Sequence, residues 1–487
     1  MPTPQGSDHN SRPPQTRNRP ASWSTGGQKK KLTRAQKRRR HNIIRYSIFA
    51  GFGIALILVL VLLISLISLI VRHVGGHSSD AASAASAISE LSAASAFSSS
   101  ELIGEQTSPE PEIEPTSVTL MAVGDNLIHN TVYEYAQVDA EGSDYDFTEI
   151  YRYVLDDIQE ADIACIQQET ILIDDPSQYS NYPTFGTPVQ MADSLATVGF
   201  DVICHASNHT WDKGITGITD SLARWRTHPE ITVLGIHDTE EDADTIRVVE
   251  KNNIRIAMLD YTYGMNGFIA DEDWQVDLLD EDHKDHIAAQ IAEAKELSDI
   301  VVVFMHTGTE GQFDPDDSQL SWAQFFADEG VGLVIGTHPH VIGPTDVLTG
   351  ESGNTMPVFY SLGNFVSSQT DTQNLVGAMA KVTISKDSSG TYVSQYSVEP
   401  VCTLISAEGT YGYGYAFHIY HLEDYTDELA AKHLRSSCYP DDFWSVWNSV
   451  FEDDAAWTPA AADTTDTADT ADTTDTADTA DTMDIAA

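Results

Sequence analysis

Five short apolar runs in this chain each end in side chains that bind metals or transfer protons. The runs are near-continuous in Val, Ile, Leu and Phe, which is typical of strands covered on both faces. In an open α/β sheet the carboxyl ends of the strands form one rim, so residues far apart in the sequence can meet there. The pattern therefore predicts an α/β fold with a metal-dependent active site. The residues at the run ends are Asp125 and His129, Glu169, Asn208 and His209, His306, and His338 and His340.

The pattern between Ser117 and Trp457 agrees with a layered α/β fold. This stretch is long enough for a substantial core, and helix-like segments lie between several of the runs. An antiparallel strand pair is expected across Asp387–Gly390. The expected strands are Val118–Val123, Ile163–Ile166, Phe200–Cys204, Ile254–Leu259, Ile300–Met305, Val331–Ile335, Val358–Leu362, Ala378–Ser385 and Tyr392–Val398, and the expected helices are Asp285–Leu297, Ser318–Glu329 and Asp424–Leu434.

Charge is distributed unevenly along the 487 residues. Residues 1–45 hold 12 of the 26 Lys and Arg residues and one acid, Asp8, whereas the whole chain has 74 Asp and Glu residues and a net charge of −48. The uncharged run from Tyr46 to Val71 is longer than the roughly 20 residues that cross a bilayer. A basic arm, an apolar run and an acidic body in this order predict a chain divided by a membrane and not a nucleic-acid binder.

The basic residues before the apolar run set the expected orientation. They gather between Lys29 and Arg40, while Arg72 and His73 are nearly alone after the run. The positive-inside rule then predicts a single-pass type II protein in the cell membrane, with a cytoplasmic N-terminus and everything after about Val74 outside. A cleaved signal peptide is the alternative, but its apolar region would span only about 7 to 15 residues.

Both flanks of the globular part are poor in large apolar residues. The Ser- and Ala-rich stretch before it cannot bury enough apolar surface to offset its ordering entropy, which predicts a flexible stalk. Repeated Thr-Ala-Asp and Thr-Thr-Asp triplets predict a disordered acidic tail. The expected parts are a basic arm at 1–45, a transmembrane signal anchor at 46–72, the stalk at 73–117, a globular domain at 118–370, a C-terminal extension of that domain at 371–457 and the tail at 458–487.

All four cysteines lie outside the membrane in this topology. Cys165 and Cys204 are in strand-like runs and are expected to be packed core thiols. A disulfide between Cys402 and Cys438 is an open alternative that their spacing does not decide. Thiolate ligation of a metal is not expected, because the chain has no C-x-x-C pair.

The first two site segments each allow two interpretations. In Val123–His129 (VGDNLIH), Asp125 directly follows a strand, where its carboxylate could hold a hard cation, although Gly-Asp pairs are also common in turns. His129 is either a ligand or substrate contact or a surface histidine. Glu169 is either a carboxylate bridging two cations or an exposed residue at a strand end.

The segment Ser207–Gly214 (SNHTWDKG) is more specific. Asn208 can give a neutral carbonyl oxygen to a metal, and His209 can lie beside it as a proton donor. Asp212 could orient His209 through a hydrogen bond. In the alternative interpretation, Asn208 and Asp212 only cap a turn and a helix.

Histidines follow two further runs, in HTGTE from His306 and in GTHPH ending at His340. Because alternate residues of an extended backbone point the same way, His338 and His340 are expected to serve one metal pair. The rigid Pro339 between them favours this arrangement. A lone histidine is usually structural, but three of them at strand ends beside carboxylates indicate a site.

Three more residues are expected beside the site as substrate contacts or supports. Asn364 lies in SLGNF, where Gly363 and Asn364 suit a tight turn that is either near the site or purely structural. Glu310 is the last residue of the segment HTGTE that begins at His306. His129, in the segment that ends the first run, is the third of these supporting residues.

Together these segments resemble the poly-γ-glutamate capsule synthesis (CapA) family, whose domain is similar to the binuclear calcineurin-like metallophosphoesterases. The resemblance covers about Val118–Gln369 and is strongest at Ser207–Gly214, Gly336–His340 and Tyr360–Phe365. It implies a layered α/β metallophosphatase-like sandwich with His209 as the catalytic acid. The metal ligands that it implies are Asp125, Glu169, Asn208, His306, His338 and His340.

Two positions depart from the family pattern. The family commonly has Asn two residues before the Glu of its second motif, where Gln167 stands here. His129 lies four residues after Asp125, whereas ordinary metallophosphoesterases use Asp-x-His. These departures leave the full ligand set of the first metal open.

The resemblance implies hydrolysis or transfer at a polar ester, amide or phosphoryl centre. Two divalent cations (Mn, Fe, Zn or Mg) would activate a bridging water, and His209 would protonate the leaving group. The implied partners are the membrane, an anionic envelope polymer such as poly-γ-glutamate or a related glycan, and other capsule-synthesis membrane subunits. Two alternatives stay open, namely a non-catalytic scaffold of a capsule export complex and a generic extracellular phosphodiesterase.

Overall fold

The computed structural model describes residues 114–451 and 456–457. The chain divides into two units, residues 1–108 and 109–487, and every described residue belongs to the second unit. Within this described part, the structure contains no helix that is both long and apolar enough to cross a membrane.

Several predicted segments lie outside the described residues. They are the basic arm at 1–45, the signal anchor at 46–72 and the acidic tail at 458–487, together with nearly all of the stalk at 73–117. The last two residues of that predicted stalk, Thr116 and Ser117, already belong to the first strand of the globular part.

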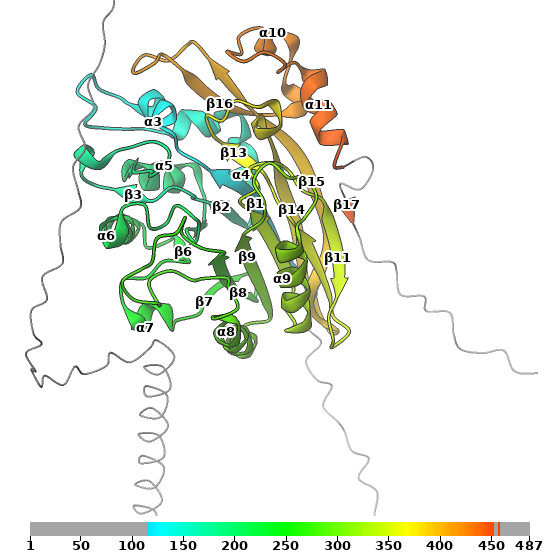
Figure 1. The fold of residues 1–487 in the computed structure, drawn as a ribbon. Helices are drawn as coiled ribbons and strands as arrows, with labels where there is room; N and C mark the ends of the chain where they lie inside the picture. The colour runs from blue at the N-terminus through cyan, green and yellow to red at the C-terminus, as the bar shows by residue number, and fades with distance from the viewer. Residues whose placement is uncertain (1–113, 452–455, 458–487) are drawn as a thin grey trace, which may run out of the picture. The chain divides into compact units, whose positions relative to one another are not determined.

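Two β-sheets pack face to face and form the centre of the globular part (Figure 1). In the first sheet the strand order is β16 (Ala416–His421), β15 (Gly390–Ser406), β14 (Val376–Asp387), β1 (Thr116–Asn126), β2 (Ile163–Gln167), β5 (Val202–Cys204) and β6 (Thr232–Leu234), with β13 (Asn364–Val366) beside β1 and β17 (Ala456–Trp457) beside β15. In the second sheet the order is β11 (Thr345–Thr349), β12 (Thr355–Phe359), β10 (Leu333–Thr337), β9 (Ile300–His306), β8 (Ile254–Thr262) and β7 (Arg247–Lys251). A short separate pair consists of β3 (Leu172–Ile173) and β4 (Thr187–Pro188).

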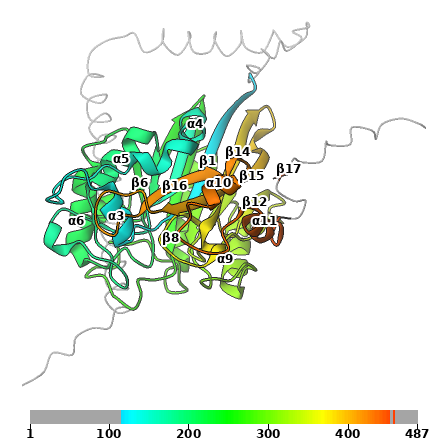
Figure 2. The same ribbon diagram turned by 90° about the horizontal axis from the view of Figure 1, so that it is seen from above.

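Helices flank this sandwich on both sides. The outer face of the second sheet is covered by α8 (Lys284–Leu297) and α9 (Asp317–Asp328), whereas α4 (Leu155–Glu160) and α5 (Gln190–Val198) lie on the side away from α9 (Figure 2). The other helices are α3 (Asn130–Ala136), α6 (Gly214–Trp225), α7 (Glu240–Ala243), α10 (Asp427–Ala430) and α11 (Pro440–Asn448), and the 3-10 turns are η1 (Thr148–Val154), η2 (Pro176–Gln178), η3 (Thr372–Leu375) and η4 (Leu422–Asp424).

Burial on both faces explains the near-continuous apolar sequence of the second sheet. Along β9, Val302 and Phe304 face the core shared with the first sheet, whereas Val301 and Val303 pack with residues of α8 and α9. Successive side chains of a strand point to opposite faces, so a strand between two apolar layers needs an apolar residue at each position. Full burial of one such side chain contributes roughly 1.5–3 kcal/mol. The predicted α/β layers are confirmed.

The helix predicted at Asp424–Leu434 forms only in part. Only η4 and the short helix α10 form there, and Ala430 is the last residue of α10. Beyond it, the backbone N–H of Leu434 donates to the carbonyl oxygen of Ile405 in β15 at 2.8 Å. The chain therefore bonds to the first sheet instead of continuing as a helix. The segment predicted as a C-terminal extension supplies β14, β15 and β16 to that sheet.

All four cysteines are buried, and none is in a disulfide. Cys165 and Cys204 lie in the main core, as predicted for packed thiols. The Cys402–Cys438 disulfide, which the sequence left open, is not formed in the structure.

Candidate metal centre

The polar residues at the strand ends of both sheets converge on one place. Asp125 is near the end of β1, Glu169 follows β2 and Asn208 follows β5, all in the first sheet. His306 is the last residue of β9, and His338 and His340 follow β10 in the second sheet. The parallel strands of each sheet thus deliver these side chains to the same end of the sandwich, as the sequence predicted.

Asp125, Glu169 and His340 form the first group at ligand distance. One ligand atom from each of these buried residues lies within 4.8 Å of the other two. His340 Nδ1 is 3.1 Å from Asp125 Oδ2, and His340 Nε2 is 3.7 Å from Glu169 Oε1. The His340 ring therefore lies between two carboxylates.

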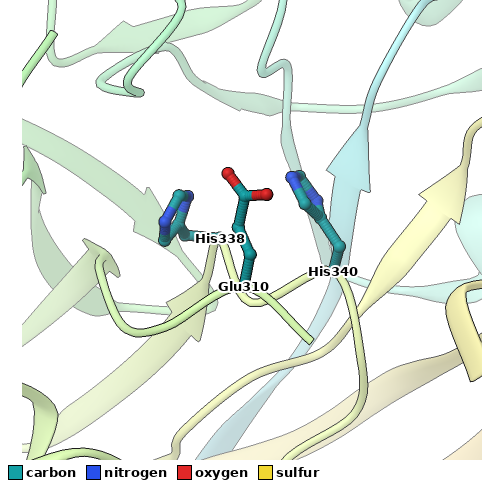
Figure 3. A group of neighbouring side chains, drawn as sticks. All are labelled: Glu310, His338 and His340. Carbon is teal, nitrogen blue, oxygen red and sulfur yellow. The ribbon is translucent and has the colours of Figure 1, made fainter. Parts of the chain in front are cut away.

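Glu310, His338 and His340 form a second group within the same distance limit. The exposed Glu310 carboxylate lies between the two imidazoles (Figure 3). Because His340 belongs to both groups, the two candidate cation positions adjoin one another. Glu310 was predicted only as a substrate contact or support, and its position makes it a candidate ligand as well.

Asn208 and His306 continue the same cluster. Asn208 Oδ1 is 3.0 Å from His306 Nε2, while His306 Nδ1 is 2.9 Å from the Thr337 hydroxyl and 3.8 Å from Asp125 Oδ1. The rings of His306 and His338 lie 4.9 Å apart. The six predicted ligands are therefore brought together in one buried cluster.

Unpartnered polar atoms test whether these residues fit a metal. Asp125 Oδ1, both carboxylate oxygens of Glu169 and His338 Nδ1 are buried without a hydrogen-bond partner among the described residues. Such atoms are costly to bury, because each has lost its bonds to water without replacement. A divalent cation would satisfy them, and mixed carboxylate and imidazole donors suit Mn, Fe, Zn or Mg. The residues present fit a metal site.

The pKa values of the cluster follow from burial and from its dense charge. Burial raises the pKa of Glu169 well above its ordinary value, and the nearby Asp125 charge adds to this effect. Burial opposes a proton on His340, but the charges of Glu169 and Asp125 outweigh it and raise the His340 pKa to about 10. Burial and the neighbouring imidazoles lower the pKa of His338 to about 3 and that of His306 well below its usual range. His306 and His338 are therefore neutral at physiological pH, as metal ligation requires, whereas a cation would have to displace the proton that Glu169 and Asp125 stabilise on His340.

His209 is oriented in the way that the sequence predicted. Its Nδ1 lies 2.7 Å from Asp212 Oδ2, which also accepts the backbone N–H of Phe185 at 2.7 Å. The Phe185 ring packs edge-on against the imidazole, with the ring centroids 4.7 Å apart. Since an ionised carboxylate only accepts, His209 Nδ1 carries the proton of this bond and Nε2 is left to exchange a proton with a substrate.

His129 belongs to neither ligand group. Its ring centroid lies 5.2 Å from that of Phe185, and its Nδ1 is 3.2 Å from the Leu127 carbonyl oxygen and 3.3 Å from the Ser368 backbone nitrogen. Burial lowers its pKa to about 4. His129 is therefore a neutral wall of the site beside Phe185.

The backbone of the His-Pro-His segment differs from the prediction. His338 and His340 were expected to point the same way from an extended strand, but both have left-handed φ angles, 99° and 59°. Such angles cost energy in residues other than Gly and are concentrated at functional sites. The His338 N–H donates to Asp125 Oδ2 at 3.2 Å, which helps to hold this turn. The two imidazoles still converge, but through a turn.

Asn364 supports His340 rather than a substrate. Its Oδ1 is 3.1 Å from His340 Nδ1, and its Nδ2 donates to Gln369 Oε1 at 2.7 Å and to the Asn374 carbonyl oxygen at 3.0 Å. Because these bonds fix the Asn364 amide, they also fix the ring that both ligand groups share.

The sequence-based interpretation missed the loop after β8, residues 263–270. The ring of Tyr263 lies 4.7 Å from that of His338, and the Asn266 amide touches Asn208 and His209. A signal was present, because the apolar run at Ile254–Leu259 is also followed by polar and glycine residues. The run also ends in a carboxylate, Asp260, which accepts the backbone N–H of Ala206 at 2.7 Å, just before the Asn208 segment.

Comparisons with known proteins agree with this arrangement. Residues 119–369 match the family described as bacterial capsule synthesis protein PGA_cap. The chain is 33% identical over 209 residues to the PGA biosynthesis protein CapA of Bacillus subtilis (strain 168), which covers 42% of this chain and 52% of that protein. It is 27% identical over 286 residues to the capsule biosynthesis protein CapA of Bacillus anthracis, covering 57% of this chain and 66% of that protein. The chain thus spans less than two thirds of the length of these relatives.

Among solved structures, the NAD nucleotidase of Haemophilus influenzae superposes with a TM-score of 0.35 at 9% identity, over 61% of this chain and 54% of that one. A likeness this weak supports no argument about activity. The geometry of the site and the sequence relatives are the stronger indications of function.

Proposed function

Because this chain belongs to the bacterial capsule synthesis protein family PGA_cap, we propose that it is a metal-dependent hydrolase or transferase acting on an anionic polymer of the cell envelope. The polymer would be poly-γ-glutamate or a related glycan, which the protein makes, attaches or trims. In this proposal the signal anchor at residues 46–72 holds the domain outside the cell, next to other capsule-synthesis membrane subunits. Nucleic acid has no part in it.

The observation that carries the proposal is the pair of ligand groups sharing His340 beside an oriented proton donor. Glu169 presents two unpartnered buried oxygens to this centre, and Asp212 holds His209 at 2.7 Å. A scaffold has no use for buried carboxylate oxygens without partners, since each destabilises the fold. A catalytic metal centre explains why these oxygens are buried, because they would bind its cations.

His209 would act at the leaving group of the scissile bond. The hydrogen bond from His209 Nδ1 to Asp212 fixes the orientation of the ring and leaves Nε2 free for the substrate. Such a positioned acid contributes typically 10²- to 10⁴-fold to a rate. Asp212 is a positioning residue in this scheme, and Phe185 packs against the imidazole in a T-shaped contact.

Asp125, Glu169, Asn208, His306, His338, His340 and Glu310 would hold the metals. When bound, two divalent cations would activate a water molecule and neutralise the charge that develops during the reaction. They would also screen the substrate from the protein, whose net charge of −48 otherwise repels a polyanion. The electrostatic attraction of such a substrate would therefore depend on the loaded centre.

The test is turnover by the full chain with defined metal content. We expect it to bind divalent metal and to cleave or transfer poly-γ-glutamate or an envelope glycan, with loss of turnover after chelation. Activity on model phosphodiesters alone would favour a generic phosphodiesterase. Metal binding without turnover of any of these substrates, together with normal capsule formation by a His209→Ala strain, would favour a scaffold.

Membrane topology is tested separately on intact cells. A cysteine introduced at residues 75–113 should react with a membrane-impermeant thiol reagent, because the positive-inside rule places this stretch outside. A cysteine introduced before Lys29 should react only after the cells are opened. The reverse labelling pattern would exclude the type II orientation and leave the chemistry of the site untouched.

A further inference from the structure

We propose that Asn266 is a positioning residue that holds the Asn208 side chain with its oxygen toward the metal centre. This inference rests on the proposed metal-dependent function and names a residue that the ligand set does not include. Asn266 lies in the loop after β8, and its amide contacts both Asn208 and His209, while Tyr263 of the same loop also interacts with the Asn208 side chain.

The chemistry of an asparagine side chain makes its orientation matter. Its amide has an oxygen that can ligate a cation and an NH₂ group that cannot, and a half turn about the last side-chain bond exchanges them. Asn208 Oδ1 faces His306 Nε2 at 3.0 Å, while Asn208 Nδ2 donates to Asn266 Oδ1 at 3.4 Å. The reversed Asn208 would bring two amide oxygens together. Asn266 therefore favours the orientation in which the oxygen faces the metals.

The contact between Asn266 and His209 has a different character. Asn266 Nδ2 is 3.5 Å from His209 Nδ1, but this nitrogen already donates its proton to Asp212 at 2.7 Å. It has no lone pair left to accept a second hydrogen bond. The contact is therefore packing against the imidazole, and the hydrogen bond to Asn208 is the interaction that positions a ligand.

The loop is fixed to the segment that it supports. Met265 and Ala270 are buried in one small apolar cluster with Trp211, which lies between His209 and Asp212 in the sequence. Asn266 itself has a left-handed backbone, with φ 49°. Asn adopts this conformation more readily than most residues, so the turn presents the amide without a large conformational penalty.

A left-handed turn alone would also favour Asn here, and two substitutions separate the roles. Asn266→Gly meets the backbone requirement and removes the amide. Asn266→Asp tolerates the same backbone and keeps an oxygen acceptor for Asn208 Nδ2. Its added negative charge would strengthen cation binding if it has any effect. A purely structural Asn266 predicts that both variants bind metal like the wild type.

The experiment measures metal binding by the full chain, with Mn²⁺ in equilibrium dialysis and Co²⁺ as a spectroscopic probe. We expect Asn266→Gly to weaken the affinity for one Mn²⁺ about 10- to 100-fold, which is the usual effect of losing a residue that supports a ligand. The Co²⁺ absorption spectrum should change, since an oxygen ligand is lost or reoriented. Asn266→Asp should retain wild-type affinity and the wild-type spectrum.

Gly264→Ala is the matched control in the same loop, because a Cβ at Gly264 meets no atom within 4 Å. It should bind both metals like the wild type. Wild-type affinity in Asn266→Gly, or equal losses in Asn266→Gly and Asn266→Asp, would overturn the inference. A wild-type chain that binds neither Mn²⁺ nor Co²⁺ would instead overturn the metal centre itself, so the two failures can be told apart.

Discussion

Two buried histidines among the described residues, His340 and His237, each lie between two carboxylates, and of these two only His340 belongs to a candidate metal centre. His340 contacts Asp125 and Glu169. His237, which follows β6, is 3.3 Å from Asp242 through Nδ1 and 2.9 Å from Asp277 through Nε2. Carboxylates raise the pKa of both rings against the effect of burial, to about 10 at His340 and about 9 at His237.

The two clusters differ in what surrounds the carboxylates. At His237, Asp242 also pairs with Arg247, and no oxygen of Asp242 or Asp277 is buried without a partner. At His340, both oxygens of Glu169 and one of Asp125 are buried without a hydrogen-bond partner. The cluster at His237 is thus a closed ion-pair network, whereas the cluster at His340 has buried carboxylate oxygens that remain free to bind a cation.

The neighbouring imidazoles make the same distinction. His306 and His338 adjoin His340 and have pKa values lowered by burial, so they can offer lone pairs to a cation. His237 has no second imidazole among its polar contacts in the described part of the chain. Contact between a histidine and a carboxylate is therefore weak evidence for a metal site. Buried carboxylate oxygens without hydrogen-bond partners, next to neutral imidazoles, are much stronger evidence.

The largest expected difference between the two clusters is in catalysis. His209→Ala should keep its metal and lose on the order of 10² to 10⁴ in rate, because the general acid is gone and the ligands are intact. Activated aryl esters should be affected less than alkyl esters, since a leaving group of low pKa needs little protonation. The measurement is turnover of both ester classes at fixed metal content.

His237→Gln is the control for this prediction, because the cluster at His237 takes no part in the proposed chemistry. Its turnover should match the wild type at temperatures well below unfolding. Full turnover by His209→Ala on alkyl substrates would remove the catalytic role of His209 and favour the scaffold alternative.

Much of the site was predictable from sequence because it is local to strand ends. A buried strand such as β9 carries a continuous apolar signal up to Met305, and its last residue, His306, is placed at the rim by the strand itself. The ligand set and the hydrogen bond between His209 and Asp212 follow from such positions and from the resemblance of the motifs to a known family.

The remaining features depend on packing between distant segments. The loop of Asn266 reaches the site because Met265 is buried with Trp211, and no periodicity in the loop reveals that contact. The turn at His338 and His340 depends on left-handed angles that their residue types do not predict. The helix expected at Asp424–Leu434 is limited to Asp427–Ala430, and beyond it Leu434 bonds to Ile405 in the first sheet.

Metal binding should separate the two clusters next. His338→Ala or His340→Ala should lower the number of metal ions bound per chain. The affinity for the remaining metal should fall at least about 10- to 100-fold, which is the typical effect of losing a residue that only supports a ligand. The α/β core should persist in far-ultraviolet circular dichroism, because its apolar layers do not include these side chains. His237→Gln should hold the full amount of metal. Unchanged metal content in both ligand variants would refute their role.

The smallest expected effect is on stability, and it belongs to His237. Burial disfavours a proton on this ring, but the charge of Asp277 and the hydrogen bond to Asp242 outweigh burial and raise its pKa from 6.5 to about 9 in the folded protein. A raised pKa means that the folded state binds the proton more tightly, so this stabilisation is complete below about pH 6.5 and is lost as the pH rises through about 9. Its size is on the order of 3 kcal/mol, given about 1.4 kcal/mol for each unit of pKa difference.

The measurement is the free energy of unfolding of the wild type and of His237→Gln in urea, at pH 6 and at pH 10. The wild type should be the more stable at pH 6, and the difference should shrink by most of its value at pH 10, because the neutral ring gains little from either carboxylate. Turnover and metal content should be the same in both proteins at pH 7. A stability difference that stays constant over this range would mean that His237 acts through packing alone, and the ion-pair interpretation of this cluster would have to be abandoned.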